Sequence, residues 1–109
     1  FHCQLMKNAT KIMENEIQKL DFQDSKIKLI SNVTAKEILN KGELKTLLID
    51  QIENRVRWRE SVNFMINNGV NHFIEIGPGK VLTGLIKRID KTVKTNTINT
   101  ESDIKDLKL

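Results

Sequence analysis

Apolar residues recur at two distinct periods along this chain of 109 residues, and these periods predict its secondary structure. Spacings of three and four residues predict amphipathic helices over residues 4–20, 44–52, 58–66 and 81–89. Short runs rich in β-branched residues predict strands over residues 25–33, 73–76 and 95–99. Thr100, with Asp103 in capping-box spacing, predicts a last short helix whose buried side carries Ile104 and Leu107. Because strands alternate with helices, we expect an α/β fold with a parallel sheet covered on both faces.

The stretch from His72 to Ile89 organises the predicted fold as a strand, a tight turn and a helix. Its strand is apolar enough to be buried on both faces. Gly77 frees the backbone for a sharp turn, and Pro78 suits the first helical position, where a missing N–H costs nothing. Gly69 stands where a glycine cap would end the preceding helix. Three strands are few for a parallel sheet, so we expect further strands from an upstream part of the protein.

Composition and charge favour a globular domain and argue against a membrane-spanning or nucleic-acid-binding protein. The sequence has 39% hydrophobic and 29% charged residues, as a globular domain does, and no apolar run approaches the roughly 20 residues of a membrane span. Its 18 basic residues are scattered among 14 acidic ones and aromatic residues make up 5%, which favours an acidic protein partner over nucleic acid. The single cysteine, Cys3, cannot form an internal disulfide, which fits a cytoplasmic location. The first residues carry neither an initiator Met nor a signal sequence, which we interpret as an internal start.

Four blocks of the sequence carry a shared pattern in a fixed order and spacing. They are Phe1-His2-Cys3-Gln4-Leu5-Met6, Ser31-Asn32-Val33, Gln51 with Val56-Arg57-Trp58 and Ser61-Val62, and Glu75-Ile76-Gly77-Pro78-Gly79-Lys80-Val81-Leu82. Together they resemble the malonyl-CoA:acyl-carrier-protein transacylases. The corresponding patterns of that family are Phe-His-x-x-Leu-Met, Ser-Asn-Val, Gln-(x)4-Val-(Arg/Gln)-Trp-x-x-Ser-Val and Glu-(Ile/Val)-Gly-Pro-Gly-Lys-Val-Leu. Any one block alone would be a weak signal, whereas four in register are specific.

This resemblance implies that the chain is part of a larger enzyme. Family members are much longer and have an α/β-hydrolase-like large subdomain with a small ferredoxin-like subdomain inserted in it. Residues 1–109 would be the C-terminal segment of the large subdomain, with part of its parallel sheet and covering helices. The ferredoxin-like subdomain and the N-terminal half are absent, and with them the Gly-His-Ser-x-Gly nucleophile elbow, the malonyl-binding Arg and the Gln loop of the oxyanion hole. We therefore expect the chain to hold only the general-base side of the site and to be inactive alone.

The resemblance also implies two catalytic residues. His2 matches the family's base, which takes the serine proton and later protonates the leaving thiol. Without the resemblance, a histidine here would as a rule belong to a frayed terminus. Gln51 matches the residue whose main-chain carbonyl orients the imidazole, so its side chain should matter little. Without the resemblance, Gln51 would be interpreted as a partly exposed glutamine at a helix end. Arg55 replaces a proline common in the family, which puts the turn after Gln51 in question.

Phe1 carries information about the substrate. In related acyltransferases, Phe before the catalytic histidine accompanies malonyl selection, whereas Ser accompanies methylmalonyl. A bulky ring would fill the space that an α-methyl group needs. By this resemblance Phe1 favours malonyl, and on the residues alone it is a core aromatic.

Two further features could be taken for functional sites, a phosphate-binding loop and a metal or cysteine site, but the neighbouring residues do not fit either one. The turn Gly77-Pro78-Gly79-Lys80 invites comparison with a phosphate-binding loop, but Ile74 stands where that motif needs its first glycine and Val81 where it needs Ser or Thr. We expect the turn to be structural. Cys3 has no second cysteine to accompany it and the sequence has only two histidines, so we expect neither a metal site nor a cysteine nucleophile.

The function that the resemblance implies is malonyl transfer from coenzyme A to an enzyme serine, and then to the pantetheine thiol of the acyl carrier protein, in fatty-acid biosynthesis. The expected partners are malonyl-CoA, the acyl carrier protein and the rest of the same protein, with no bound cofactor, nucleic acid or membrane. The alternative hypothesis is a non-catalytic interaction module that has kept this scaffold. A small nucleic-acid binder is a third hypothesis, which predicts steeply salt-dependent binding.

Overall fold

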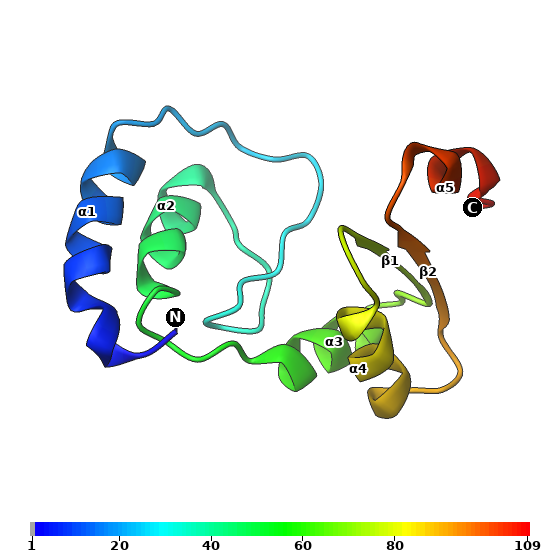
Figure 1. Cartoon of the computed structure of the whole chain (residues 1–109). Helices are drawn as coiled ribbons and strands as arrows, with labels where there is room; N and C mark the ends of the chain where they lie inside the picture. The colour runs from blue at the N-terminus through cyan, green and yellow to red at the C-terminus, as the bar shows by residue number, and fades with distance from the viewer. Residues whose placement is uncertain (1) are drawn as a thin grey trace. The chain divides into compact units, whose positions relative to one another are not determined.

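The computed structural model describes residues 2–109, which divide into two compact units, one ending at Ser61 and the other running from Val62 to Leu109. In chain order the elements are η1 (Gln4–Met6, a 3-10 helix), α1 (Lys7–Gln18), α2 (Lys41–Asp50), α3 (Trp58–Asn67), β1 (His72–Ile76), α4 (Val81–Ile89), β2 (Lys94–Ile98) and α5 (Glu101–Asp106) (Figure 1). Most of the predicted elements are therefore present. The boundary between the units falls inside α3.

The first unit consists mainly of two helices that lie side by side, α1 and α2, and a long loop between them (Figure 1). Ile17 of α1 and Leu47 of α2 are buried. The side chain of Asn40 accepts a hydrogen bond from the Glu43 N–H at 2.9 Å and so caps α2, which begins at Lys41, inside the predicted connection 34–42. Much of the apolar stripe predicted over residues 4–20 is exposed, at Leu5 in η1, at Ile12 and Met13 in α1 and at Leu20 beyond its end.

The strand predicted over residues 25–33 is wrong. This segment is a loop with a single antiparallel bridge, between Ile30 and Glu37. The hydroxyl of Ser25 hydrogen-bonds to both the N–H and the carbonyl of Ile27, at 3.1 and 2.7 Å, and thus binds groups that a neighbouring strand would otherwise pair. The apolar, β-branched composition was a signal for a strand, but a strand also needs a partner along its length. Here the backbone pairing is limited to two hydrogen bonds around the bridge, from the Ser31 N–H to the Lys36 carbonyl at 3.0 Å and from the Ile38 N–H to the Leu29 carbonyl at 2.8 Å.

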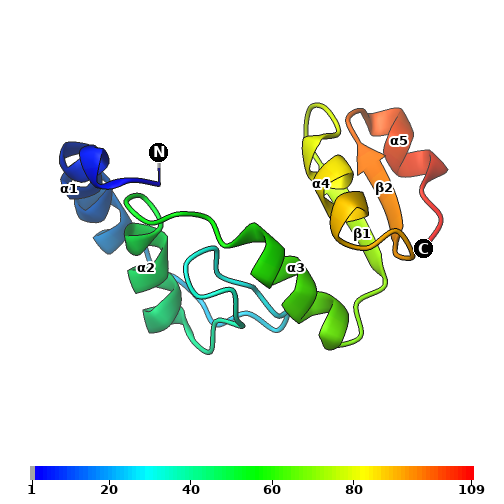
Figure 2. The same cartoon turned by 90° about the horizontal axis from the view of Figure 1, so that it is seen from below.

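The second unit is built around two parallel strands joined by a helix (Figure 2). β1 pairs with β2 in parallel, in a register that runs from His72 opposite Lys94 to Ile76 opposite Ile98, and α4 supplies the crossover that a parallel pair requires. Val62, Ile86 and Val93 are buried. The predicted parallel pairing is confirmed, but β1 is only half-buried and Ile76 is 78% exposed, because no second layer covers both of its faces in the described residues.

Gly69 ends α3 as predicted. Its φ of +94° lies in the left-handed region, and its N–H donates to the Ile66 carbonyl at 3.0 Å. The N–H of Val70 donates to the Met65 carbonyl at the same distance, which completes a Schellman motif. A residue without a Cβ adopts this conformation at low cost, so the glycine sets where the helix stops.

The turn after β1 differs from the prediction. Pro78 is not the first helical residue, because α4 begins at Val81, three positions later in the chain. Gly77 and Gly79, with φ of +138° and +85°, form the turn on either side of Pro78. The chain thus needs both glycines to reverse direction before the helix can start.

The C-terminal helix α5 has the predicted capping box. The Thr100 hydroxyl accepts from the Asp103 N–H, and the Asp103 carboxylate accepts from the Thr100 N–H. Its predicted buried side is only partly correct, since Leu107 is half-buried but Ile104 is 58% exposed. A capping signal acts within one helical turn, whereas burial depends on what packs against the helix.

Candidate active site

The imidazole of His2 lies against the main-chain carbonyl of Gln51, with Nδ1 2.6 Å from the oxygen. A carbonyl oxygen can only accept a hydrogen bond, so this contact requires the proton on Nδ1. The lone pair of the neutral ring is then on Nε2, which has the chemistry of a base. The structure thus brings together the two residues that the resemblance singled out, although they are 49 positions apart.

A second hydrogen bond fixes the backbone of His2. Its N–H donates to the carbonyl of Ile52 at 2.8 Å, so two successive carbonyls hold the residue, one through its ring and one through its backbone. The φ of His2 is +62°, in the left-handed region, where a non-glycine residue costs on the order of 1–3 kcal/mol. Such backbone conformations persist where surrounding contacts enforce them and are frequent at functional sites.

Gln51 is the C-cap of α2, and this position explains why its carbonyl is available. Its N–H still donates to Leu47 within the helix, but the last carbonyls of a helix have no intrahelical donor. The carbonyls of Gln51 and Ile52 therefore accept from His2 instead.

Asn32 is a third residue at this site, and sequence reasoning did not assign it a role there. Its Nδ2 donates to the Gln51 side-chain oxygen at 3.3 Å, and its own carbonyl accepts from the Arg57 N–H at 2.9 Å. The preceding residue, Ser31, is 5% exposed and its hydroxyl accepts from the Val33 N–H. Three of the four sequence blocks thus converge on the end of α2. The signal in the sequence was the block Ser31-Asn32-Val33, but no periodicity links it to Gln51.

A pocket of about 140 Å³ borders Asn32 and Gln51. The rest of its lining is mostly apolar and consists of Leu29, Ile30, Ser31, Ile38, Leu44, Leu47 and Leu48. Pockets for drug-sized ligands occupy roughly 300–1,000 Å³, so this one is too small for a coenzyme A thioester.

The other residues singled out in the sequence have simpler surroundings. Phe1 lies outside the described residues. Arg55 makes an exposed ion pair with Glu60 at 3.6 Å, which contributes little stability. Arg55 was expected to put the turn after Gln51 in question, but the carbonyls of Gln51 and Ile52 both accept hydrogen bonds from His2. In residues 2–109, no group of three or more His, Cys, Asp or Glu side chains is arranged to hold a metal ion.

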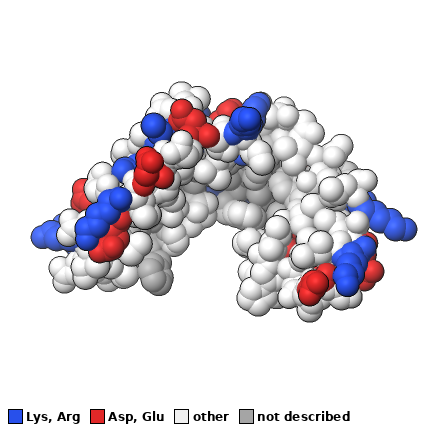
Figure 3. Space-filling model, turned by 90° about the horizontal axis from the view of Figure 1, so that it is seen from above, with Lys and Arg blue, Asp and Glu red and all other residues white. Residues whose placement is uncertain are grey.

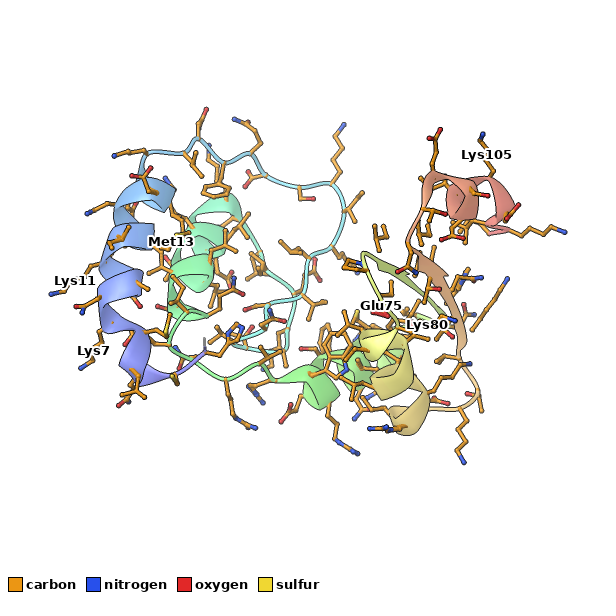
Figure 4. The ribbon with its side chains drawn as sticks, viewed as in Figure 1. Lys7, Lys11, Met13, Glu75, Lys80 and Lys105 are labelled. Carbon is orange, nitrogen blue, oxygen red and sulfur yellow. The ribbon has the colours of Figure 1, made fainter. Side chains whose placement is uncertain are left out.

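In the second unit, Glu75 organises the turn that contains the two glycines. One carboxylate oxygen accepts from the N–H and the hydroxyl of Thr83, at 2.9 and 3.0 Å, and the other accepts from the Leu82 N–H at 3.1 Å. The pKa of Glu75 is lowered, chiefly by the Thr83 N–H. Figure 4 shows Glu75 and Lys80 beside the first turn of α4. The carboxylate therefore caps α4, which supports a structural role for this turn.

Charged side chains do not form a single basic stripe on the face shown in Figure 3, where basic and acidic groups lie next to one another. Lys7 and Lys11 point outward from α1 (Figure 4). Among the helices of residues 2–109, none has the length and apolar character needed to cross a lipid bilayer.

Comparisons with known proteins identify similar chains. No model of a known protein family matches. A malonyl CoA-acyl carrier protein transacylase of Bacillus subtilis (strain 168) is 41% identical over 99 residues, which cover 91% of this chain and 31% of that protein. Its counterpart in Staphylococcus aureus (strain COL) is 39% identical over 105 residues, 96% of this chain and 34% of that protein.

Several solved structures of such proteins also resemble this structure over nearly its whole length. The crystal structure of an acyl-carrier-protein-S-malonyltransferase from Bartonella henselae superposes with a TM-score of 0.90 at 39% identity, over 97% of this chain and 34% of that one. A malonyl-transacylase in complex with its type II PKS acyl-carrier protein gives 0.86 at 35% identity, over 94% and 33%. The α/β segment with its two parallel strands thus matches part of a larger fold, and the chain spans about one third of the length of these relatives.

Proposed function

Because the chain is a homologue of the malonyl-CoA:acyl-carrier-protein transacylases over about one third of their length, we propose that it supplies the general-base side of such an enzyme's active site. In this proposal the chain is the C-terminal segment of an α/β-hydrolase-like large subdomain. The rest of the protein supplies the nucleophilic serine, the arginine that pairs with the malonyl carboxylate and the oxyanion hole.

The proposed reaction is acyl transfer in two half-reactions with a covalent intermediate. Nε2 of His2 takes the proton of the serine hydroxyl as the serine oxygen attacks the thioester carbon of malonyl-CoA. The carbon–sulfur bond then breaks, and the imidazolium returns the proton to the departing coenzyme A thiolate. In the second half-reaction the pantetheine thiol of the acyl carrier protein gives its proton to His2, and its sulfur attacks the carbonyl carbon of the malonyl ester. The ester carbon–oxygen bond then breaks, and the imidazolium returns the proton to the serine oxygen, which restores the free hydroxyl.

The observation that carries this proposal is the 2.6 Å contact between His2 Nδ1 and the Gln51 carbonyl. It accounts for the tautomer that a base acting through Nε2 requires, without an aspartate. The Gln51 carbonyl can keep this hydrogen bond while Nε2 also carries a proton, because it accepts only from Nδ1–H.

Substrate and partner follow from the relatives. Phe1, directly before His2, is proposed to exclude the α-methyl group of methylmalonyl. The acyl carrier protein is the proposed acceptor, supported by the solved complex of a homologous malonyl-transacylase with such a protein. Coenzyme A enters as the thioester substrate and no bound cofactor is required.

The test compares the two histidines of the chain in the full-length protein. His72 is the matched control, because its Nε2 also makes a 2.6 Å hydrogen bond, to the Asn96 side chain, but in the second unit. We expect His2→Ala to lower malonyl loading of the acyl carrier protein by roughly 10²–10⁴-fold, the usual contribution of a general base. His72→Ala should leave the rate per folded molecule near that of the wild type. If His2→Ala still loaded carrier protein at the wild-type rate, His2 would not be the base.

A further inference from the structure

The side chain of Gln51 is part of the site, although the sequence suggested that only its carbonyl matters. Its amide oxygen accepts a hydrogen bond from Asn32 Nδ2 at 3.3 Å, and both side chains are half-buried. Gln51 therefore contacts a partner at each end: its carbonyl binds the His2 ring and its side chain binds the loop.

Asn32 is a fixed point in that loop. The carbonyl of Asn32 accepts from the Arg57 N–H at 2.9 Å, and the guanidinium of Arg57 donates to the Thr34 carbonyl at 3.2 Å. Ser31 before it is buried. These contacts hold the backbone of Asn32 in place, so its side-chain amide can restrain the side chain of Gln51, which accepts from it.

The end of a helix is a mobile acceptor. Its terminal residues fray because their carbonyls have lost the donors of a following turn. The carbonyl that faces His2 belongs to the residue that ends α2, and a change in the orientation of its peptide plane would remove the hydrogen bond to Nδ1. A side-chain anchor on Gln51 resists that change.

We propose that Asn32 is a positioning residue that, by holding the Gln51 side chain, keeps the Gln51 carbonyl aimed at Nδ1 of His2 and thereby sets the tautomer of the base. This inference rests on the proposed function of His2. Asn32 acts on the base through its hydrogen bond to the Gln51 side chain.

The test uses the full-length protein with Gln51→Met, Asn32→Ala and the double variant. Loss of one hydrogen bond should lower kcat for malonyl transfer by roughly three- to tenfold, with KM for malonyl-CoA unchanged. In protein labelled with ¹⁵N-histidine, the His2 ring should lose part of its Nδ1–H signal and gain the Nε2–H form. Because both single changes break the same contact, the double variant should be no slower than either one. Multiplying effects would contradict the proposal.

Two further variants separate positioning from general loosening of α2. Gln51→Glu keeps an acceptor for the Asn32 amide and should keep the Nδ1–H signal. Asn54→Ala removes another side-chain bond at the same helix end, from its Nδ2 to the Asp50 carbonyl at 2.7 Å, without touching Gln51. It should leave both kcat and the ring signal unchanged. If it reproduced the effect of Gln51→Met, the anchor would be no more than a helix cap and the proposal would be wrong.

The outcome for His2→Ala distinguishes the two proposals. If that variant loses transfer while Gln51→Met and Asn32→Ala keep both the wild-type kcat and the ring signal, the positioning role is overturned and the proposed function stands. If His2→Ala keeps transfer, both are overturned. Should Asn32→Ala fail to fold, Gln51→Met decides the question, because it keeps the length of the side chain and the backbone.

Discussion

The candidate site in the first unit and the glycine turn in the second are built from different kinds of contact. In the turn, Glu75 binds residues seven and eight positions away in the helix that follows it. At the site, Asn32 and Gln51 are 19 positions apart and His2 and Gln51 are 49 apart. The turn thus depends on local geometry, and the site depends on separate loops and helix ends meeting.

This difference shows that the most distinctive stretch of the sequence, the glycine turn, is not the stretch that contains the candidate site. The turn carries the longest unbroken block of the family resemblance because several of its positions have a strict local requirement, such as φ angles of +138° and +85°. The proposed general base requires one imidazole and one carbonyl, and any residue can provide a carbonyl. A long motif therefore marks a stretch with strict backbone requirements, and a short one can still contain the proposed base.

The largest expected stability effect is at the turn itself. Gly77→Ala places a Cβ at φ of +138°, which is accessible almost only to glycine, and should destabilise the protein by about 1–3 kcal/mol. Gly84 is the matched control: it lies inside α4 with no heavy atom within 4 Å of an added Cβ, so Gly84→Ala should stabilise by roughly 0.5–1 kcal/mol. Denaturant unfolding measures both.

The activity of Gly77→Ala sharpens the comparison between the two regions. If the turn only supports the fold, kcat per folded molecule should stay at the wild-type value despite the lower stability. A fall in kcat under conditions where the variant is fully folded would mean that the turn also belongs to the site.

A smaller effect is expected from the helix caps, one in each unit. Asn40→Ala removes the N-cap of α2 and Thr100→Ala that of α5, and each should cost about 1 kcal/mol of unfolding free energy. Asn40 lies at the opposite end of α2 from Gln51, so neither change should alter kcat. A severalfold loss of kcat in Asn40→Ala alone would show that the site depends on the whole of α2 and not on its last turn.

Local signals explain which parts of the fold could be predicted. Gly69 and the pair Thr100–Asp103 act within one helical turn, and both helix ends were predicted correctly. The strand over residues 25–33 was predicted wrongly because only residues 29–31 find a short backbone partner, at residues 36–38, and Ser25 satisfies the backbone groups of Ile27. Apolar periodicity registers neither effect. The exposure of Ile76 was also missed, because burial depends on which surface faces a residue.

The candidate site was predicted only through the family resemblance. Periodicity and composition place His2 at an unremarkable end of the chain and Gln51 at a helix end, with nothing to pair them. The contact between Asn32 and Gln51 was not predicted at all, since amide side chains at separate turns have no spacing rule. The catalytic roles of His2 and Gln51 stay predictions until the variants are measured.

The smallest expected effect is confined to acid pH and again distinguishes the two units. The carboxylates whose pKa is lowered by hydrogen bonds, Glu75, Asp90 and Asp103, all lie in the second unit. For Glu75 the folded pKa is below its ordinary value of 4.5, so its stabilisation is present above that pH and is lost as the pH falls through the lower folded value. Glu75→Gln should therefore flatten the decline of stability below pH 4.5, and Asp103→Asn should act in the same direction.

Hydrogen exchange should show that the first turn of α4 loses protection on acidification before α2 does. If α4 and α2 lost protection at the same pH, the two units would unfold together. The difference between the two units would then not include their stability.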